Sequence, residues 1–412
     1  MTNVRVTRSL SIPDPLRISR YRKIPELGPR ILFFSGGSAL NSLCKTLKNY
    51  SHNSIHLLTP FDSGGSSAEL RKAFDMPSIG DLRSRLMALA DETVLGHPEI
   101  VALFEHRLDK AASQQLLLMQ LNELIRGKSP LISDIANPMR KLICNQLGFF
   151  LAAMPENFDL RGASIGNLIL AGGYLNNHRH LDPIIFLFSK LVNVQGIVRT
   201  IVNDDLHLGA DLEDGSEVIG QHLITGKEVA PLDSAIEHIF LSQDPEMKSI
   251  KSISIRKKNR KLIESAELIC YPPGSFYSSL LANLIPEGVG KAIAENDCPK
   301  VYIPNLGSDP EQFNMDLTSS VERLLAQLHA DCDDSTTNQQ LLNFVLLDSR
   351  NGIYPSKLSS EVLASLNIEL IDTRLISKQS APYYDNELLV SALMSLTYNT
   401  DALISSEKST CK

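Results

Sequence analysis

The chain has 412 residues, of which 43% are hydrophobic, so it is long enough to bury one large core or two linked ones. Its net charge of −7 and pI near 5.8 argue against a general nucleic-acid binder, which usually shows a basic face. The six cysteines form no C-x-x-C pair, and no apolar run is long enough to span a bilayer. We therefore expect a folded, soluble protein of the reducing cytoplasm that binds neither nucleic acid nor membrane.

Residues 1–30 are rich in arginine and are interrupted by proline. Their basic residues are opposed only by Asp14 and Glu26. We predict a basic N-terminal arm here, which is either a solvated lead-in or a segment that grips a phosphate or a partner. Prolines and charge alone favour the solvated arm.

From residue 31 onward, apolar strands alternate with glycine turns and helices. Strands are predicted at 31–34 and 55–59, with a helix at 39–48 between them. The same alternation predicts further strands and a closing helix at 268–271, 301–303, 344–347 and 386–396. This order predicts an α/β protein with a doubly wound, mostly parallel sheet.

Two regions depart from this alternation. Residues 99–160 carry apolar side chains at helical spacing without a strand signal, which predicts a helical block. Residues 196–230 change to a period of two, and Asp214-Gly215 is typical of a hairpin tip, so a small β-hairpin element is predicted there. We expect both to belong to a single domain that spans residues 31–412.

Four short turns with glycine follow or separate these elements, and they are the strongest functional signal in the chain. In an open parallel sheet, loops at the carboxyl ends of the strands form the ligand site, and glycine lets backbone N–H groups approach a phosphate closely. Glycine can also be needed for the turn conformation alone. Four such turns, each beside a predicted strand or helix, nevertheless favour a nucleotide or another phosphate ester as ligand. The turns lie at residues 35–38, 62–67, 164–167 and 272–275.

The segment from residue 62 to 83 has the highest density of groups that could donate hydrogen bonds to a phosphate. It combines backbone N–H groups and serine hydroxyls with arginine guanidinium groups. Asp62 follows a strand directly, where an acid holds either a ribose or a Mg²⁺ ion beside a diphosphate. The first turn lacks the full G-x-G-x-x-G, so we do not predict a hydride-transfer enzyme. The predicted phosphate-binding residues are Gly36, Gly37, Ser38, Gly64, Gly65, Ser66, Ser67, Arg71, Gly80, Asp81, Arg83, Gly166, Asn167, Pro273, Gly274 and Ser275.

Together these motifs resemble the CofD/YvcK superfamily over roughly residues 30–400. The resemblance implies a modified Rossmann-like sheet, a homodimer, and a nucleotide site to which Asn283 and Asn305 also belong. The CofD branch is a Mg²⁺-dependent transferase that moves a phospholactyl-type group from a guanosine diphosphate-linked donor to a deazaflavin alcohol and releases GMP. The YvcK branch regulates carbon metabolism and cell-wall synthesis and binds UDP-sugars without an established reaction.

The glycine and arginine motifs are more similar to the YvcK branch, because the acidic pair of the CofD branch is reduced here to Asp62-Ser63. Ser38, Ala68 and Pro272 stand where the family carries glycine. The resemblance implies a transferase in which Asp62 is the catalytic residue and either holds Mg²⁺ or orients the acceptor hydroxyl, while glycine turns and arginines offset developing charge. The alternatives are a regulator that binds nucleotide-sugars without catalysis and a scaffold that has lost ligand binding.

Overall fold

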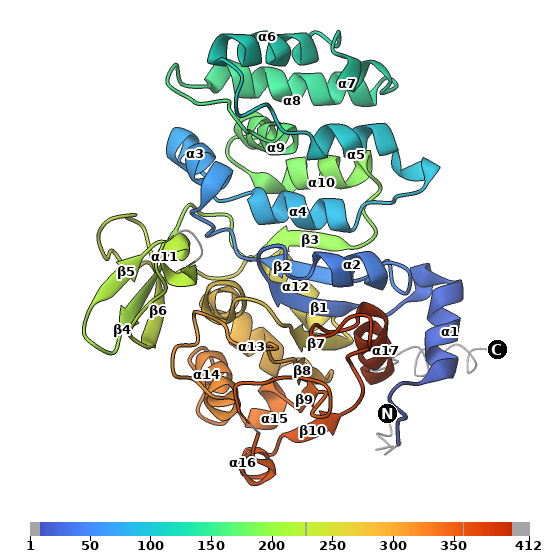
Figure 1. Cartoon of the computed structure of the whole chain (residues 1–412), viewed down its shortest axis with the longest axis vertical. Helices are drawn as coiled ribbons and strands as arrows, with labels where there is room; N and C mark the ends of the chain where they lie inside the picture. The colour runs from blue at the N-terminus through green and yellow to red at the C-terminus, as the bar shows by residue number, and fades with distance from the viewer. Residues whose placement is uncertain (1–8, 227–228, 357, 398–412) are drawn as a thin grey trace, which may run out of the picture.

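The computed structural model describes residues 9–226, 229–356 and 358–397, and Figure 1 shows its main body as a sheet with helices on both faces. The sheet has seven parallel strands in the order β10-β9-β8-β7-β1-β2-β3. This confirms the predicted α/β class. Strand β10 was not indicated by the sequence patterns, and β3, which falls at the start of the region 196–230 predicted as a hairpin element, pairs with β2 and so belongs to the main sheet. The strands are β1 Ile31–Ser35, β2 Ile55–Leu58, β3 Ile197–Thr200, β7 Leu268–Tyr271, β8 Lys300–Tyr302, β9 Phe344–Leu347 and β10 Glu369–Asp372.

Strand β1 lies inside the sheet, between β7 and β2, because the chain winds in two directions from it. It pairs with β2 on one side and with β7 on the other, and the later strands continue outward from each. Ile31 and Phe33 pack into one hydrophobic core, whereas Leu32 and Phe34 pack into the core on the opposite face. Burial on both faces explains the unbroken apolar run of this strand. The loops after β1 and β7 diverge at this point, which makes it the switch point of the sheet.

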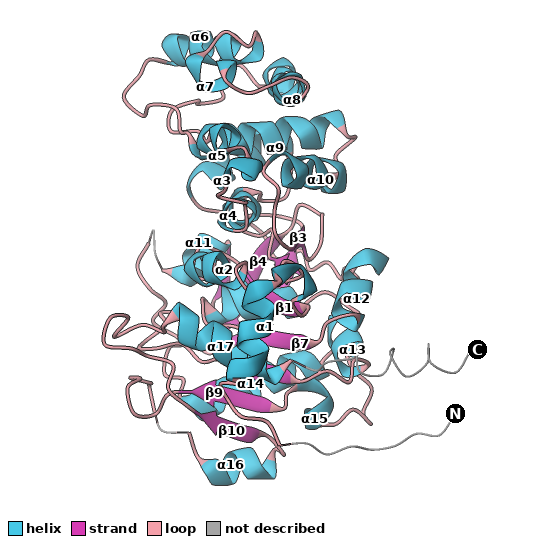
Figure 2. Ribbon diagram, turned by 90° about the vertical axis from the view of Figure 1, so that its right-hand side faces the viewer, coloured by secondary structure: helices cyan, strands magenta, loops and turns pink. Residues whose placement is uncertain are grey.

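Different helices cover the two faces (Figure 2). Helices α1, α2 and α17 contribute to the first core, and α12, α13 and α14 contribute to the second. Within the predicted basic arm, α1 packs on α17, and the guanidinium of Arg17 donates to the carbonyl oxygens of Ser395 and Thr397. The bounds are α1 Pro15–Lys23, α2 Asn41–Leu47, α12 Lys257–Glu264, α13 Val289–Ala294, α14 Leu317–His329, α15 Asn338–Leu341, α16 Ser360–Ser365 and α17 Asn386–Leu396.

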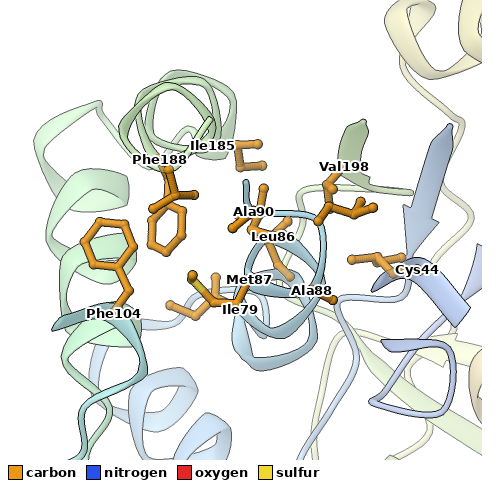
Figure 3. Close-up of a cluster of buried hydrophobic side chains, with 14 of the residues drawn as sticks. Cys44, Ile79, Leu86, Met87, Ala88, Ala90, Phe104, Ile185, Phe188 and Val198 are labelled. Atoms are coloured by element: carbon orange, nitrogen blue, oxygen red, sulfur yellow. The ribbon is translucent and has the colours of Figure 1, made fainter. Parts of the chain in front are cut away.

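The helical block lies at the β3 end of the sheet (Figure 1). Its helices continue past the predicted end at residue 160, because α9 and α10 belong to the same packed layer. Helix α4 lies between the block and the sheet: in Figure 3, Met87 lies on the side of Phe104 of α5 and Phe188 of α10, and Leu86 lies on the side of Val198 of β3. The bounds are α3 Gly65–Phe74, α4 Gly80–Ala88, α5 Pro98–Glu105, α6 Gln114–Ile125, α7 Pro130–Ser133, α8 Met139–Ala153, α9 Ile165–Asn176 and α10 Leu181–Leu191.

A small antiparallel sheet, β5-β4-β6, stands beside the main body. Strands β4 and β5 form the predicted hairpin, and Gly215 near its tip adopts a positive φ of 85°. The sequence pattern did not indicate the third strand, β6. Within the described residues, no helix combines the length and apolar character needed to cross a bilayer. The bounds are β4 His207–Leu212, β5 Glu217–Ile219, α11 Gln221–Thr225 and β6 Ile236–Ser242.

Candidate functional site

A cavity of about 310 Å³ opens at the carboxyl ends of β1, β2 and β7, where the sheet changes winding direction. We call it the sheet-edge cavity. The loops after all three strands contribute to it, and α11 of the small sheet closes one side. It therefore has the position that ligands take in open parallel sheets. Its lining residues are Gly36, Gly37, Ser38, Ala39, Asp62, Gly64, Asp81, Gln221, His222, Thr225, Ser275 and Ser279.

A second cavity, of about 640 Å³, extends from there toward the helical block, and we call it the helix cavity. Asp62, Gly64 and Asp81 line both cavities, so the two adjoin at these residues. Its walls are Asp62, Gly64, Gly65, Ser66, Ser67, Glu69, Leu70, Gly80, Asp81, Arg83, Ser84, Arg107, Lys110, Phe158, Asp159, Arg161, Gly162, Ala163, Ser164, Asn167 and Leu168.

Three helix N-termini meet at the helix cavity, those of α3, α4 and α9. In the described part of the chain, no side chain caps any of the three. Each N-terminus directs the positive end of a helix dipole toward the cavity, and backbone N–H groups at a helix start favour an anion. At the start of α9, the N–H of Ile165 already donates to the carbonyl oxygen of His106 at 2.9 Å. Three helix dipoles thus point at one cavity, although they start in different segments of the chain.

Helix α4 also holds the turn after β1. The N–H of Gly37 donates to Oδ2 of Asp81 at 2.6 Å, and the buried Arg85 donates to the carbonyl oxygen of Gly37 at 3.3 Å. Gly37 has a φ of 53°, a left-handed conformation that favours glycine. At Gly36 the backbone comes so close to its neighbours that a Cβ would lie 2.7 Å from Oγ1 of Thr59. Both glycines of the turn are therefore required by its geometry.

Arg83 connects α4 to α9, because its Nε donates to Oδ1 of Asn167 at 2.9 Å. Burial, followed by the nearby positive charge of Arg107, lowers the pKa of Arg83 below its usual range, while Glu105 acts in the opposite direction. The guanidinium is thus a partly desolvated cation beside the cavity. Such a cation attracts an anionic ligand more strongly than a fully solvated one.

Asp62 lies where the two cavities adjoin. Its Oδ1 accepts from the N–H of Gly64 at 3.1 Å, and its Oδ2 lies 3.5 Å from the position of a Cβ on Gly80. The next residue, Ser63, places its hydroxyl 2.8 Å from Nδ1 of His222 on α11. Asp62 can accordingly contact a ligand in either cavity.

These motifs agree with comparisons to known proteins. The sequence profile of the family described as 2-phospho-L-lactate transferase CofD matches residues 31–385. The chain belongs to the CofD family. The predicted resemblance is thereby confirmed.

Relatives of this CofD-family chain include a gluconeogenesis factor from Bacillus subtilis (strain 168), 29% identical over 282 residues, or 68% of this chain and 69% of that protein. A putative gluconeogenesis factor from Thermotoga maritima is 25% identical over 336 residues, 81% of each chain. An uncharacterized protein of Saccharomyces cerevisiae is 30% identical over 224 residues, which cover 50% of this chain and 48% of that protein. A solved Bacillus halodurans structure superposes with a TM-score of 0.63 over 89% of this chain and 99% of that one, at 22% identity, and supports the fold.

Most of the predicted site residues of this CofD-family chain line the two cavities, but Arg71 does not. Its guanidinium is buried and donates to Oδ1 of Asp205 at 2.7 Å and to the carbonyl oxygens of Phe61 and Leu206. These bonds tie α3 to β2 and to the start of β4, so the structure assigns Arg71 to the framework of the site. A role in phosphate binding stays a prediction.

Gly166 and Asn283 also lie behind the cavity walls. A Cβ on Gly166 would lie 2.5 Å from the carbonyl oxygen of Phe104 and 2.7 Å from Cδ of Arg83, so glycine allows α9 to pack closely. The side-chain nitrogen of Asn283 donates to the carbonyl oxygens of Ser35 and Ser279, which fixes the end of β1. Both residues support the site through its backbone.

The turn after β7 reaches the sheet-edge cavity only through Ser275, and Pro273 stays outside it. Asn305 donates to and accepts from the backbone of Gly274, with both distances at 2.7 Å. The next N–H groups, in the helical turn η3 (Phe276–Leu280), donate to carboxylates from the loop after β8: Phe276 to Asp309, and Tyr277 and Ser278 to Glu311. These N–H groups are therefore already occupied by carboxyl oxygens of the protein itself.

Some residues of the site have no local sequence signal. Arg107, Lys110 and Arg161 lie in connections of the helical block, and His222 lies in a short helix after the hairpin. Each is a single polar residue without a motif around it. Only the folding of the block and of the small sheet over the strand ends brings them to the cavities.

Proposed function

We propose that this CofD-family protein binds a nucleoside diphosphate-linked small molecule across the two cavities. The observation that carries the proposal is the meeting of three uncapped helix N-termini, with Arg83 beside them, at a cavity that adjoins the switch point of the sheet. A diphosphate at the N-termini of α3 and α4 would receive backbone N–H groups and the hydroxyls of Ser66 and Ser67. The volume of the helix cavity, about 640 Å³, suits a ligand of this size.

The activity that we propose is transfer of a phospho-linked group to an acceptor alcohol. The acceptor oxygen forms a bond to the β-phosphorus, the bond from that phosphorus to the bridging oxygen breaks, and the nucleoside monophosphate leaves with that oxygen. Asp62 orients the acceptor hydroxyl and takes its proton. The helix N-termini and Arg83 stabilise the charge that develops on the phosphoryl oxygens.

Mg²⁺ fits this site only together with the ligand. Among the residues that the structure describes, no three His, Cys, Asp or Glu side chains gather in a way that could hold a metal by themselves. Asp62 and Asp81 both line the two cavities, and one or two carboxylates plus phosphate oxygens are the usual ligands of Mg²⁺ beside a nucleotide. When bound there, the ion would offset the charge of the diphosphate.

A second candidate function is regulation by a bound nucleotide-sugar without turnover. The relatives named gluconeogenesis factors favour it, as does the single carboxylate at Asp62-Ser63. In this case the same cavities bind the ligand, and occupancy is transmitted through the helical block or a homodimer surface of the cytoplasmic protein.

The test is an incubation of the purified full chain with Mg²⁺ and nucleotide-linked donors, with and without acceptor alcohols. Release of GMP or UMP that depends on the acceptor supports the transferase. Calorimetric binding of the same compounds without release supports the regulator. Absence of both binding and release, with the protein folded, contradicts the proposed function.

A matched pair of glycine substitutions tests where the diphosphate binds. Gly80→Ala is expected to lower nucleoside diphosphate affinity about tenfold, because the new Cβ would lie 2.5 Å from Oγ of Ser67 and force it to turn. Gly148→Ala, on α8, is the control, since its Cβ would meet only Ile125 at an ordinary 3.9 Å. Equal affinities in calorimetric titrations of the two variants would contradict this placement.

A further inference from the structure

Part of the predicted basic arm forms one wall of a third cavity, of about 520 Å³, which we call the arm groove. Helix α1 and the residues just before it contribute one wall, and α17 and the segment after β10 contribute the rest. Figure 1 shows α1 beside α17. The arm groove shares no lining residue with the sheet-edge cavity or the helix cavity, so the proposed nucleotide site does not account for it.

The α1 wall of the groove is fixed to the main body. Asp14 caps α1, because its Oδ1 accepts from the N–H groups of Leu16 and Arg17, both at 3.1 Å. The N–H of Asp14 in turn donates to Oγ of Ser395 on α17 at 2.8 Å. Together with the bonds of Arg17 to the end of α17, these contacts hold the two helices in place. A ligand of the groove therefore does not have to order its walls.

The segment after β10 is fixed in the same way. The N–H of Thr373 donates to the carbonyl oxygen of Leu347 at 3.0 Å, which continues the pairing of β10 with β9. The N–H of Leu375 donates to Oδ2 of the buried Asp348 at 2.9 Å. Arg374 lies between these two bonds, so its backbone is held while its side chain is exposed.

The lining of the arm groove combines apolar side chains with arginine and contains no acidic side chain. Its charged residues are Arg22 of α1 and Arg374, and both are exposed. The other lining residues are mostly apolar, and they come from both helices and from the proline-containing start of α1. The apolar residues are Pro13, Pro15, Ile18, Leu388 and Ala392.

Neither arginine of the groove is neutralised within the part of the chain that the structure describes, because neither forms an ion pair there. The guanidinium of Arg22 lies 6.0 Å from the centre of the Tyr50 ring. Glu387 of α17 lies next in sequence to the groove, but its Oε2 accepts from the hydroxyl of Tyr50 at 2.5 Å. Helix α1 itself carries basic residues and no acidic one. The groove is thus a basic surface on a chain whose net charge is −7.

These two features together indicate the chemistry of the occupant. Planar guanidinium groups bind carboxylates through paired hydrogen bonds, and arginine is enriched where proteins bind each other. The apolar lining is stabilised by burying apolar side chains, which a small phosphorylated metabolite does not provide. A nucleic acid would need a wider basic face and would be repelled by the negative charge of the chain. A peptide segment with both acidic and apolar side chains matches the whole lining.

We propose that the arm groove docks a segment of a partner protein that combines acidic and apolar side chains, and that Arg22 and Arg374 bind its carboxylates. The segment around α1 is then a partner-binding element of the basic arm. The proposal goes beyond the proposed function and does not depend on it, because the groove lies outside both nucleotide cavities.

The experiment selects phage-displayed random peptides on the immobilised full chain. We expect the enriched peptides to combine Asp or Glu with apolar residues. A synthetic copy of an enriched peptide, labelled with fluorescein, is then titrated with the wild type and with the double variant Arg22→Glu with Arg374→Glu. Fluorescence anisotropy is expected to show about tenfold weaker binding to the double variant, because both attractions become repulsions.

Arg126→Glu with Lys128→Glu is the matched control. These exposed cations follow α6 in the helical block, and their substitution changes the net charge by the same amount. This variant is expected to bind the peptide within about twofold of the wild type. Selection of peptides without acidic residues, or equal binding to the wild type and to the groove variant, would overturn the inference.

Two further measurements address other occupants of the groove. Analytical ultracentrifugation is expected to give the same oligomeric state for the wild type and the groove variant. A wild-type dimer that dissociates in the variant would overturn the inference and assign the groove to a second copy of the chain. Binding of the wild type to phosphatidylserine vesicles that is lost in the variant would overturn it in favour of a membrane surface.

Discussion

Asp62→Asn is expected to lower the rate of nucleoside monophosphate release at least about a hundredfold, the size of effect seen when one group that stabilises a transition state is removed. Asparagine keeps the shape of the side chain and the oxygen that accepts from the N–H of Gly64. It removes the negative charge that is needed to take a proton from the acceptor or to hold Mg²⁺. Steady-state release of GMP or UMP measures the effect.

Binding data from the same variant separate the two roles of Asp62. In the absence of Mg²⁺, a carboxylate repels a diphosphate, so Asp62→Asn is expected to bind it more tightly than the wild type does. With Mg²⁺ present, the order is expected to reverse. Asp134→Asn, an exposed acid on the helical block, is the control and is expected to match the wild type. An unchanged release rate in Asp62→Asn would remove this residue from the mechanism.

The sequence predicted those parts of the site that depend on local chain geometry. A turn such as Gly36-Gly37 follows from a buried strand and the left-handed conformation that glycine permits, and both are visible in a short segment. The helix starts at Gly65 and Gly80 are equally local. Because all these segments follow parallel strands or pack on them, their meeting at one edge could also be predicted.

Other parts of the site depend on contacts between distant residues, and a single sequence does not encode these visibly. Arg71 lies in the densest motif, but its partner Asp205 is 134 residues away, and their ion pair takes the guanidinium out of the cavity. Arg107 and Lys110 show the reverse, since they lack a motif and the packing of the helical block brings them to the cavity. Residue type and spacing indicate a function only when the residue's neighbours are also local.

In the turn after β7, the partners of backbone N–H groups likewise come from a distant segment that the local sequence does not indicate. Its Pro-Gly-Ser sequence predicts open N–H groups at a helix start, as in the other turns. The loop after β8 supplies Asp309 and Glu311, whose carboxylates accept from these N–H groups. Acidic side chains of the protein itself therefore occupy these N–H groups, and the sequence around the turn does not indicate this.

The buried carboxyl group of Glu311 has a large expected effect on stability. Glu311 is only 2% exposed and accepts from the N–H groups of Tyr277 and Ser278 and from the hydroxyl of Ser278. Glu311→Ala leaves these buried donors without a partner and is expected to lower the free energy of unfolding by about 3 kcal/mol. At pH 4.5, Glu311→Gln keeps a side-chain oxygen acceptor and is expected to cost about 1 kcal/mol. Urea denaturation measures both, and similar values for the two variants would contradict this account.

The pH dependence of that stability has a definite sign. Burial, followed by the charge of Asp309, raises the pKa of Glu311 above its ordinary value of 4.5, although the donors from Ser278 and Tyr277 oppose the shift. The folded state therefore binds the proton of Glu311 more tightly than the unfolded state does. The stability that this proton gives to the folded state is fully present below pH 4.5 and is lost as the pH rises through the raised pKa. The wild type should therefore lose stability relative to Glu311→Gln as the pH is raised from 4.5. Asp309→Asn should weaken this trend, because it removes the neighbouring charge. If the difference in free energy of unfolding between the wild type and Glu311→Gln stays constant with pH or changes in the opposite direction, the N–H donors outweigh burial.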